Sequence, residues 1–329
     1  MNKYKLLMTI LVVLLVVLGG SIFWLCGGAS VLGFASADKY TSGNTEITDS
    51  VENLEIEWTA GKVCIEYHAG SGVTVSETSP RQLSEDEKLR WWMDGKTLRI
   101  QYVKPGLQLH ANLQKTLTVS LPEGTVLKKA VIGATSADLD VPMLAADEIV
   151  FDTTSGDVNA VTDTKKLTAS STSGDINIRQ DSDLDTVVLS STSGSMAFTG
   201  QSVNELSGKS TSGGIGVTLS GSVGNIRMDS TSGTLCADLV NADKAEFSAT
   251  SGSITVSALT FRDLLIDATS GDVTLKLPEA PGFTLELDAR PSRLSSGLAM
   301  EKNGNLYICG DGSAHCKIST TSGDIRIVK

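Results

Sequence analysis

Apolar and polar residues alternate over short stretches of this chain, and the stretches return at a nearly constant spacing. Between Ile149 and Leu275 each return is marked by the phrase Thr-Ser-Gly, with alternating apolar residues before and after it. Alternate residues of a β-strand share one face, so the pattern predicts two short strands per repeat, each with one apolar face.

We number the positions of a repeat from the glycine of its Thr-Ser-Gly phrase. Positions −7, −5, +2 and +4 are apolar in nearly every repeat and are predicted to point inward, as in Ile149, Phe151, Val158 and Ala160. From Gly156 to Gly271 the glycines are 18 to 20 residues apart, and a last copy follows after a gap of 52. The predicted corner glycines are Gly156, Gly174, Gly194, Gly213, Gly233, Gly252, Gly271 and Gly323.

A fixed period of this size is typical of stacked-coil folds, in which one repeat cannot bury its apolar face alone. We therefore predict an all-β parallel β-solenoid whose coils of about 19 residues stack about 4.8 Å apart. At each corner the glycine is expected to supply a turn or bulge conformation that is costly to other residues. We expect the serine to point inward and the threonine to line the corner. Position −3 is always small: Thr153, Ser171, Ser191, Ser210, Ser230, Ala249 and Ala268.

The flanking regions 46–130 and 278–329 follow the same alternation less regularly than the solenoid proper, 131–277. Leu54 and Val63 keep the register around Gly61, so residues 46–130 are predicted to be degenerate coils or a cap. Residues 278–329 are predicted to hold a strand, a hairpin at Asn303-Gly304 and a closing coil. This insert is expected to protect the open end of the solenoid from edge pairing.

The segment 80–93 interrupts the strands before 97–103. Ser84 and Glu87 have the spacing of a capping box, which predicts a short helix or helical turn. Trp91 and Trp92 follow it. In an alternating strand one of two neighbouring rings faces the core, and this structural interpretation is favoured over a ligand surface. The pair is nevertheless our candidate partner surface, because here the repeat breaks.

An uncharged N-terminal stretch is the other strong pattern in the sequence. No charged residue occurs between Lys5 and Asp38, and residues 6–28 are long and apolar enough to cross a bilayer as a helix. Lysines precede this stretch, so residues 1–5 are predicted to be cytoplasmic and the bulk extracytoplasmic, with 29–45 as linker. This makes the chain a single-pass cell-membrane protein. The alternative is a signal peptide cleaved after Ala37.

Composition excludes some function classes. The chain has 38 Asp+Glu against 27 Lys+Arg, which argues against a nucleic-acid partner, because phosphate neutralisation needs clustered cations. The cysteines do not form a dense disulfide framework, although Cys309 and Cys316 have the spacing to pair across a turn. The alternative is that Cys316 is simply a small buried residue. His and Cys lack zinc spacing, and we expect neither metal nor cofactor.

Catalytic patterns are absent from the repeat. Asp157 and Asp175 fall on neighbouring coils at position +1, but Ser195 and Gly214 replace the acid in the next two. Such a broken column is better explained by carboxylates bonding turn backbone than by the paired carboxylates of glycoside hydrolysis. The repeated threonines are likewise interpreted as a corner ladder rather than as a surface that binds ordered ligands. We expect no enzymatic activity.

The phrase Thr-Ser-Gly-Asp-Ile/Val, as at Thr154–Val158 and Thr321–Ile325, follows an alternating strand and carries a family resemblance. Over roughly residues 46–329 the chain resembles the bacterial putative-adhesin family, which includes LiaG-like membrane proteins. The resemblance implies a binding or scaffolding role at the cell envelope and brings no catalytic residues with it. Some members of the family are associated with cell-envelope stress-response systems. The resemblance therefore implies an alternative function, an accessory role in such a response. A polysaccharide-active β-helix enzyme is the third hypothesis, and the partner is expected to be an envelope protein or glycan.

Overall fold

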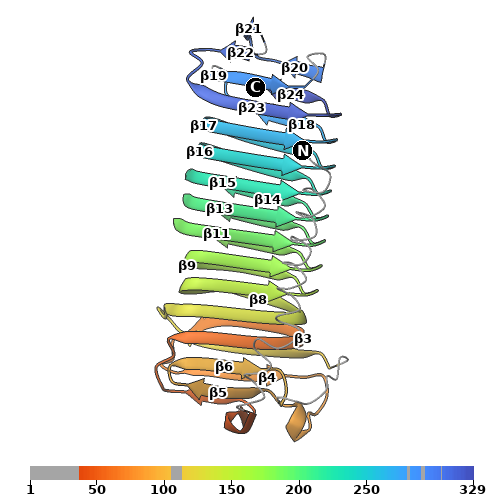
Figure 1. Cartoon of the computed structure of the whole chain (residues 1–329). Coiled ribbons are helices and arrows are strands. Elements are labelled where there is room, and N and C mark those ends of the chain that lie inside the picture. Colours follow the sequence, from red (N-terminus) through yellow and green to blue (C-terminus); the bar gives the residue numbers. More distant parts are fainter. Residues whose placement is uncertain (1–36, 105–112, 280–281, 290–292, 305) are drawn as a thin grey trace.

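The chain forms one long stack of β-coils. The structure, a computed structural model, describes residues 37–104, 113–279, 282–289, 293–304 and 306–329 (Figure 1). The predicted anchor at 6–28 and the tail at 1–5 lie outside the described residues, as do residues 29–36 of the predicted linker; its remainder, 37–45, already contains η1, β1 and the start of β2. Within the described ranges, no helix has the length and apolarity needed to cross a bilayer. Among the described residues, the short 3-10 turns η1 (Ala37–Lys39) and η2 (Glu85–Glu87) interrupt the strands.

Two ladders of strands face each other across the core, and the Thr-Ser-Gly corner joins them. We call the strands before the glycine the pre-glycine sheet and those after it the post-glycine sheet. From the N-terminal end, the pre-glycine sheet contains β1 (Thr41–Ser42), β5 (Arg90–Asp94), β6 (Thr97–Gln101), the first half of β3 (Asn53–His68), both ends of β8 (Leu127–Thr153), the second half of β9 (Val158–Ser171), β11 (Leu184–Ser191), β13 (Val203–Ser210), β15 (Ser222–Ser230), the second halves of β16 (Leu235–Ala249) and β17 (Ile254–Ala268), β23 (Ala314–Thr320), β19 (Phe283–Asp288), β22 (Leu306–Cys309) and β21 (Glu301–Asn303).

The post-glycine sheet is built in the same way. It contains β2 (Thr45–Ile47), β4 (Val73–Thr78), β7 (Lys115–Pro122), the remaining parts of β3, β8, β9, β16 and β17, and β10 (Ile176–Gln180), β12 (Met196–Gly200), β14 (Ile215–Leu219), β18 (Val273–Lys276), β24 (Ile325–Val328) and β20 (Leu294–Ser296). We call the second bend, where each coil returns to the pre-glycine sheet, the return corner.

Successive coils pair in parallel with equivalent residues opposite each other. Ile176, for example, lies opposite Val158 on one side and Met196 on the other. Every residue at positions −7, −5, +2 and +4 of the seven regular repeats is buried, as predicted, and so is the small residue at position −3. The all-β fold and its apolar columns are therefore confirmed. Like residues stack on like, so each coil buries its apolar face only against its neighbours.

Both ends of the stack are closed by the same change in strand order. At the N-terminal end, the coil formed by β6 and β7 lies outside β3, which is inserted between that coil and β8. At the C-terminal end, the last coil, β23 and β24, is inserted between β17–β18 and β19–β20, although β19 and β20 precede it in the chain. The outermost strands are then very short: β1, β2, β20 and β21 have two or three residues each. Short terminal strands leave little free edge for pairing with another chain.

The two C-terminal cysteines do not pair. Cys309 on β22 lies opposite Phe283, whereas Cys316 on β23 lies opposite Leu285, so strand β19 separates them. Both are free and buried. Burial raises the pKa of Cys316 to about 12. The alternative interpretation, that Cys316 is a small buried residue, is thus confirmed.

Candidate functional site

The corner glycines are required by close stacking of the backbone. A Cβ atom placed on Gly174 would lie 2.0 Å from the carbonyl oxygen of Gly156, and one on Gly213 would lie 2.0 Å from that of Gly194. None of the eight predicted corner glycines has a positive φ. The expectation that they supply a turn conformation costly to other residues is therefore wrong. The constraint comes from the preceding coil, whose carbonyl group occupies the space that a side chain would need.

The threonine and serine of the corner both face solvent in the regular repeats. Ser173 is exposed and donates its backbone N–H to the carbonyl of Thr154 at 2.9 Å. The prediction that this serine points inward is wrong, because strict alternation is lost where the chain bends. The buried hydroxyl is that of position −3 instead. Ser210 Oγ donates to the carbonyl of Gly213 at 2.6 Å, and so closes its own corner.

The aspartates at position +1 also stabilise the stack. Asp157 accepts a hydrogen bond from the backbone N–H of Asp175 at 2.8 Å, and Asp175 accepts one from Ser195 at 2.8 Å. Each carboxylate thus bonds the equivalent residue of the next coil. This confirms the structural interpretation of the column. Within the described residues, no group of His, Cys, Asp and Glu is arranged to hold a metal ion.

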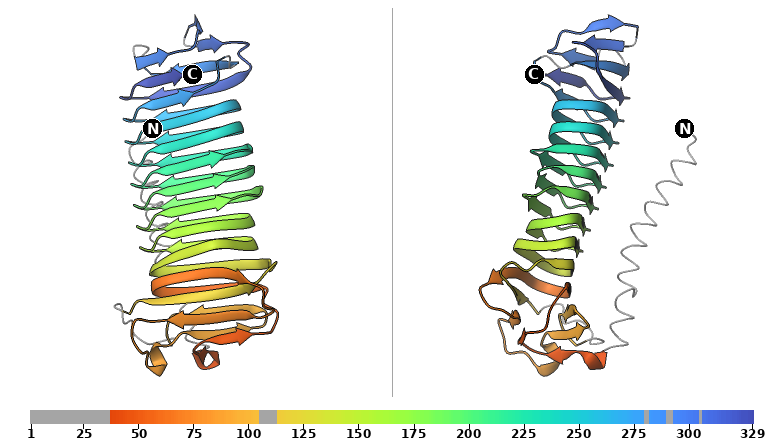
Figure 2. Two further views of the ribbon diagram at one scale, coloured as in Figure 1. Left: turned by 180° about the vertical axis from the view of Figure 1, so that it is seen from behind. Right: turned by 90° about the vertical axis from the view of Figure 1, so that its left-hand side faces the viewer.

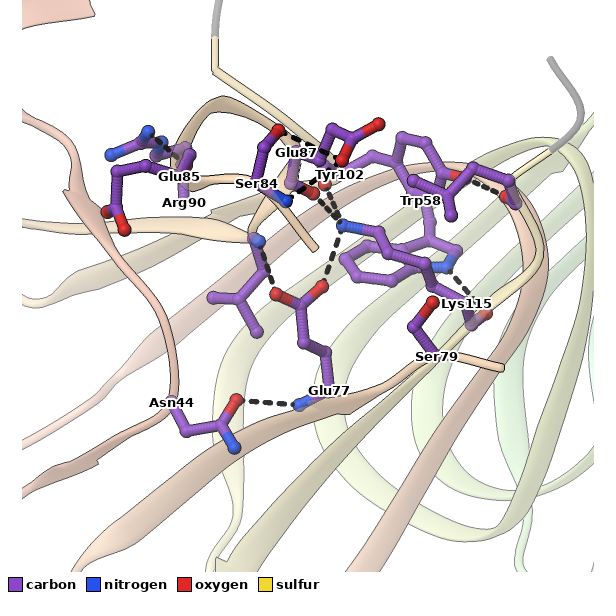
Figure 3. A network of polar contacts seen from close by, with 12 residues as sticks. Asn44, Trp58, Glu77, Ser79, Ser84, Glu85, Glu87, Arg90, Tyr102 and Lys115 are labelled. Carbon is purple, nitrogen blue, oxygen red and sulfur yellow. Dashed lines mark hydrogen bonds and ion pairs between the residues drawn. The ribbon is translucent and has the colours of Figure 1, made fainter. Parts of the chain in front are cut away.

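A buried ion pair closes the N-terminal end of the core (Figure 3). Lys115 on β7 is buried, and its Nζ lies 2.7 Å from a carboxylate oxygen of Glu77 on β4. It also donates to the carbonyl of Glu87 at 2.8 Å and to that of Tyr102. Glu77 in turn accepts the backbone N–H of Leu89 at 2.7 Å. The chain itself therefore supplies three oxygen acceptors to the ammonium group.

Two aromatic rings enclose this lysine. Its Nζ lies 4.9 Å from the ring centre of Trp58 and 4.3 Å from that of Tyr102, and the two rings meet edge to face at 5.0 Å. Burial lowers the pKa of the Lys115 ammonium, whereas Glu77 opposes this change. A lysine enclosed on all sides cannot reach a substrate, so we interpret the cluster as a structural plug.

The 3-10 turn η2 completes the plug and positions the Glu87 carbonyl. Ser84 donates both its backbone N–H and its hydroxyl to one carboxylate oxygen of Glu87, each at 2.9 Å. The predicted capping box is therefore confirmed, on a turn rather than a full helix. Arg81 binds both carboxylate oxygens of Glu87, at 3.0 and 2.5 Å. The Arg81 guanidinium holds the pKa of Glu87 well below its usual range.

The two neighbouring tryptophans face opposite sides of the pre-glycine sheet. Trp91 lies opposite Ile100 and packs against the core, as the structural interpretation predicts for one ring of the pair. Trp92 lies opposite Arg99 and points outward, and both rings are half-buried. Sequence reasoning missed its neighbours Lys39 and Tyr40. They precede it by some fifty residues and reach it through the antiparallel pairing of β1 with β5.

The return corner carries two grooves. A polar groove of about 540 Å³ crosses four coils and is lined by Asp183, Leu184, Asp185, Ser202, Val203, Asn204, Ser222, Val223, Gly224, Asn241 and Asp243. A smaller, mostly apolar groove of about 340 Å³ lies nearer the C-terminal end and includes the exposed Val240 and Leu259. In the polar groove, Gly224 interrupts the column of side chains that runs from Asp185 to Asp243.

Comparison with known proteins places this geometry in a defined class. A two-sided stack of parallel coils, closed at both ends by antiparallel strands, is a β-solenoid-like domain, and the family model Toastrack DUF4097 matches residues 51–264 and 162–328. The chain belongs to the Toastrack DUF4097 family. No curated protein matches it.

Several solved structures are similar in part. A putative adhesin from Parabacteroides distasonis is 16% identical over 73% of this chain and 97% of that one, with a TM-score of 0.48. A putative adhesin from Parabacteroides merdae is 12% identical over 88% and 97% of the two chains, with a TM-score of 0.47. A putative lipid binding protein from Parabacteroides distasonis is 14% identical over 88% and 97%, with a TM-score of 0.44. Similarity at this level carries no argument about function.

Proposed function

We propose that the chain is a non-enzymatic, membrane-anchored protein whose extracytoplasmic solenoid binds a polar partner at the bacterial cell envelope. The apolar, uncharged stretch at 6–28 is the proposed anchor. The observation that supports binding is the polar groove at the return corner. Its carboxylates, amides and hydroxyls come from four successive coils, and each coil is fixed by backbone hydrogen bonds to the next.

The groove suits an extended partner better than a compact one. Coils about 4.8 Å apart present side chains at regular intervals, so a linear chain of sugars or amino acids can meet one coil after another. The gap at Gly224 provides depth midway along the line from Asp185 to Asp243. By contrast, the outermost strands described at the ends of the solenoid have two or three residues each, which is short for β-edge addition.

Site-specific cross-linking in intact envelopes tests this function. A photoreactive residue at exposed Asn204, inside the groove, should form a discrete adduct with a protein or wall glycan. The same residue at exposed Asn177, on the post-glycine sheet, is the matched control and should not. Asp185→Asn with Asp243→Asn should weaken the adduct. Equal labelling at both positions, or none at Asn204, would contradict the proposal.

The nature of the adduct separates the alternatives. Proteins of a stress-response system would favour the accessory role over adhesion. A wall glycan that is shortened after binding would favour the polysaccharide-active enzyme, whereas an intact glycan would support binding alone.

A further inference from the structure

A small aromatic and cationic cluster surrounds Trp92 on the outer face of the pre-glycine sheet. The Tyr40 ring meets the Trp92 ring edge-on, with 5.7 Å between ring centres. Lys39 Nζ lies 4.7 Å from the centre of the Trp92 ring, and the Arg99 guanidinium lies 5.9 Å from it. Lys39 is exposed and the two rings are half-buried. We call Lys39, Tyr40 and Trp92 the aromatic corner.

The charges near the aromatic corner are partly paired. Arg99 forms ion pairs with Glu55 and, at 3.2 Å, with Asp94, so both carboxylates have a cationic partner. Burial raises the pKa of Tyr40 to about 12, so its phenol remains neutral under physiological conditions. The surface therefore presents two amphipathic rings and one exposed ammonium group, flanked by Asp94 and Glu55, which share the single cation of Arg99.

The position of this cluster in the chain determines what lies near it. The described chain begins with η1, which contains Lys39, at the N-terminal end of the stack, while β21 lies at the opposite end (Figure 2). Ten residues separate the proposed anchor, which ends at residue 28, from Lys39. Fully extended, they span at most about 40 Å. The tip at β21 lies on the order of 70 Å further along the ladder, at about 4.8 Å per strand.

We propose that the aromatic corner docks on the headgroup layer of the membrane that holds the anchor. Tryptophan and tyrosine rings favour this layer because one edge of each ring is apolar and the other is polar. A neighbouring lysine can place its ammonium group among lipid phosphates while its methylene chain stays in the apolar layer. The proposal rests on the proposed anchor. Because the short linker keeps the corner close to the bilayer, even a weak contact is occupied much of the time.

Docking at this end defines the orientation of the solenoid. The N-terminal end rests on the bilayer, and the grooves and the β21–β22 hairpin extend away from it. The half-buried Tyr307 on β22 is then distal. This arrangement presents the polar groove to the cell wall rather than to lipid.

Quenching of tryptophan fluorescence by headgroup-labelled lipid tests the contact. The full chain carries four tryptophans, and Trp24→Phe removes the one in the proposed anchor. In phosphatidylcholine vesicles containing a headgroup-labelled nitroxide lipid, this variant should lose a large share of its emission. Adding Trp92→Phe should abolish most of the loss, since Trp58 is 2% exposed and Trp91 packs against the core. Equal quenching with and without Trp92 would overturn the proposal.

Two further variants provide the controls. In the chain with both tryptophans replaced, Tyr307→Trp places a reporter at the distal end and should show no added quenching. Quenching there equal to that of Trp92 would exclude the orientation. Lys39→Gln should reduce the quenching of Trp92, more so when phosphatidylglycerol is added. Flotation of the protein with vesicles distinguishes failure of the anchor from failure of docking. If the protein does not float with the vesicles, the anchor is refuted. If it floats but Trp92 is not quenched, only the docking is refuted.

Discussion

The glycine corner looks very different in the middle of the stack and at its N-terminal end. In the middle, the column holds glycine at position 0 and a small residue at −3, as in Gly174 and Ser171. At the end, the register places Lys115 opposite Gly61, and Tyr102 takes the place next to Trp58. The same two positions therefore change from the smallest residues of the core to some of the largest.

The stacking geometry explains the change. A Cβ on Gly61 would lie 2.0 Å from the carbonyl oxygen of Lys115, so close approach continues to the outermost coil. Lys115 is the last member of the column that pairs in parallel with the next coil, and beyond β7 the sheet continues with the antiparallel strand β4. A long side chain fits there and fills the end of the core. Because its charge is removed from water, Glu77 and backbone carbonyls must satisfy it.

The largest effect is expected from removing this buried charge. Lys115→Met should lower the free energy of unfolding by about 3–5 kcal/mol, because it leaves the Glu77 carboxylate buried without a cation. Thermal unfolding of the full chain in detergent, followed by circular dichroism, measures the loss. The double variant Lys115→Met with Glu77→Leu should be more stable than the single one. If both are equally destabilised, the ion pair is not the cause.

The second test adds one methyl group in the middle of the stack. Gly213→Ala places Cβ 2.0 Å from the carbonyl oxygen of Gly194, where only backbone can yield, and should cost about 3 kcal/mol. Gly216→Ala is a matched control on the same coil, since its Cβ would be 3.9 Å from the nearest atom. The free energies of unfolding of the two variants, measured under the same conditions, show whether the cost is specific to the corner glycine. Equal stability of the two would show that backbone stacking does not select glycine.

This contrast also shows how far the sequence could predict the structure. Burial at positions such as Val158 and Phe151 follows from alternation within one coil, and local patterns suffice for it. The role of Gly213 depends on the carbonyl of Gly194, which belongs to another coil and leaves no mark within the repeat. Ser173 was misassigned because alternation was extended through a bend. Inside a corner the chain does not keep the geometry of a strand.

The N-terminal end was harder still to predict. Lys115 and Glu77 are brought together because β4 pairs in antiparallel orientation with β7, the last strand of the parallel stack on this side. One signal was available: placing Leu117 and Val119 in the +2 and +4 columns puts Lys115 in the glycine column, where a charge demands a partner. The insertion of β3 between later strands has no such signal, because either strand order preserves the alternation.

A third, smaller effect concerns the aspartate column of the regular coils. Asp175→Ala removes the acceptor of the Ser195 N–H and should cost about 1 kcal/mol. Asp175→Asn keeps an acceptor oxygen in the same place and should cost less, which separates hydrogen bonding from charge. Chemical unfolding of the two variants measures the difference. If both lose stability equally, charge rather than the hydrogen bond is responsible.

The smallest effect returns to the outer face near Trp92 and concerns pH. Burial, with a further contribution from Glu55, raises the pKa of Glu57 above its usual value of 4.5. Between that value and its higher folded-state pKa, the folded protein binds more protons than the unfolded chain, so stability falls as pH rises through this window. Glu57→Gln cannot titrate and should lose less stability between mildly acidic and neutral pH. If the free energies of unfolding of the two proteins change equally with pH across this range, Glu57 titrates as it does in solvent. In that case the outer face around Glu57 would be as well solvated as the outer faces of the regular coils.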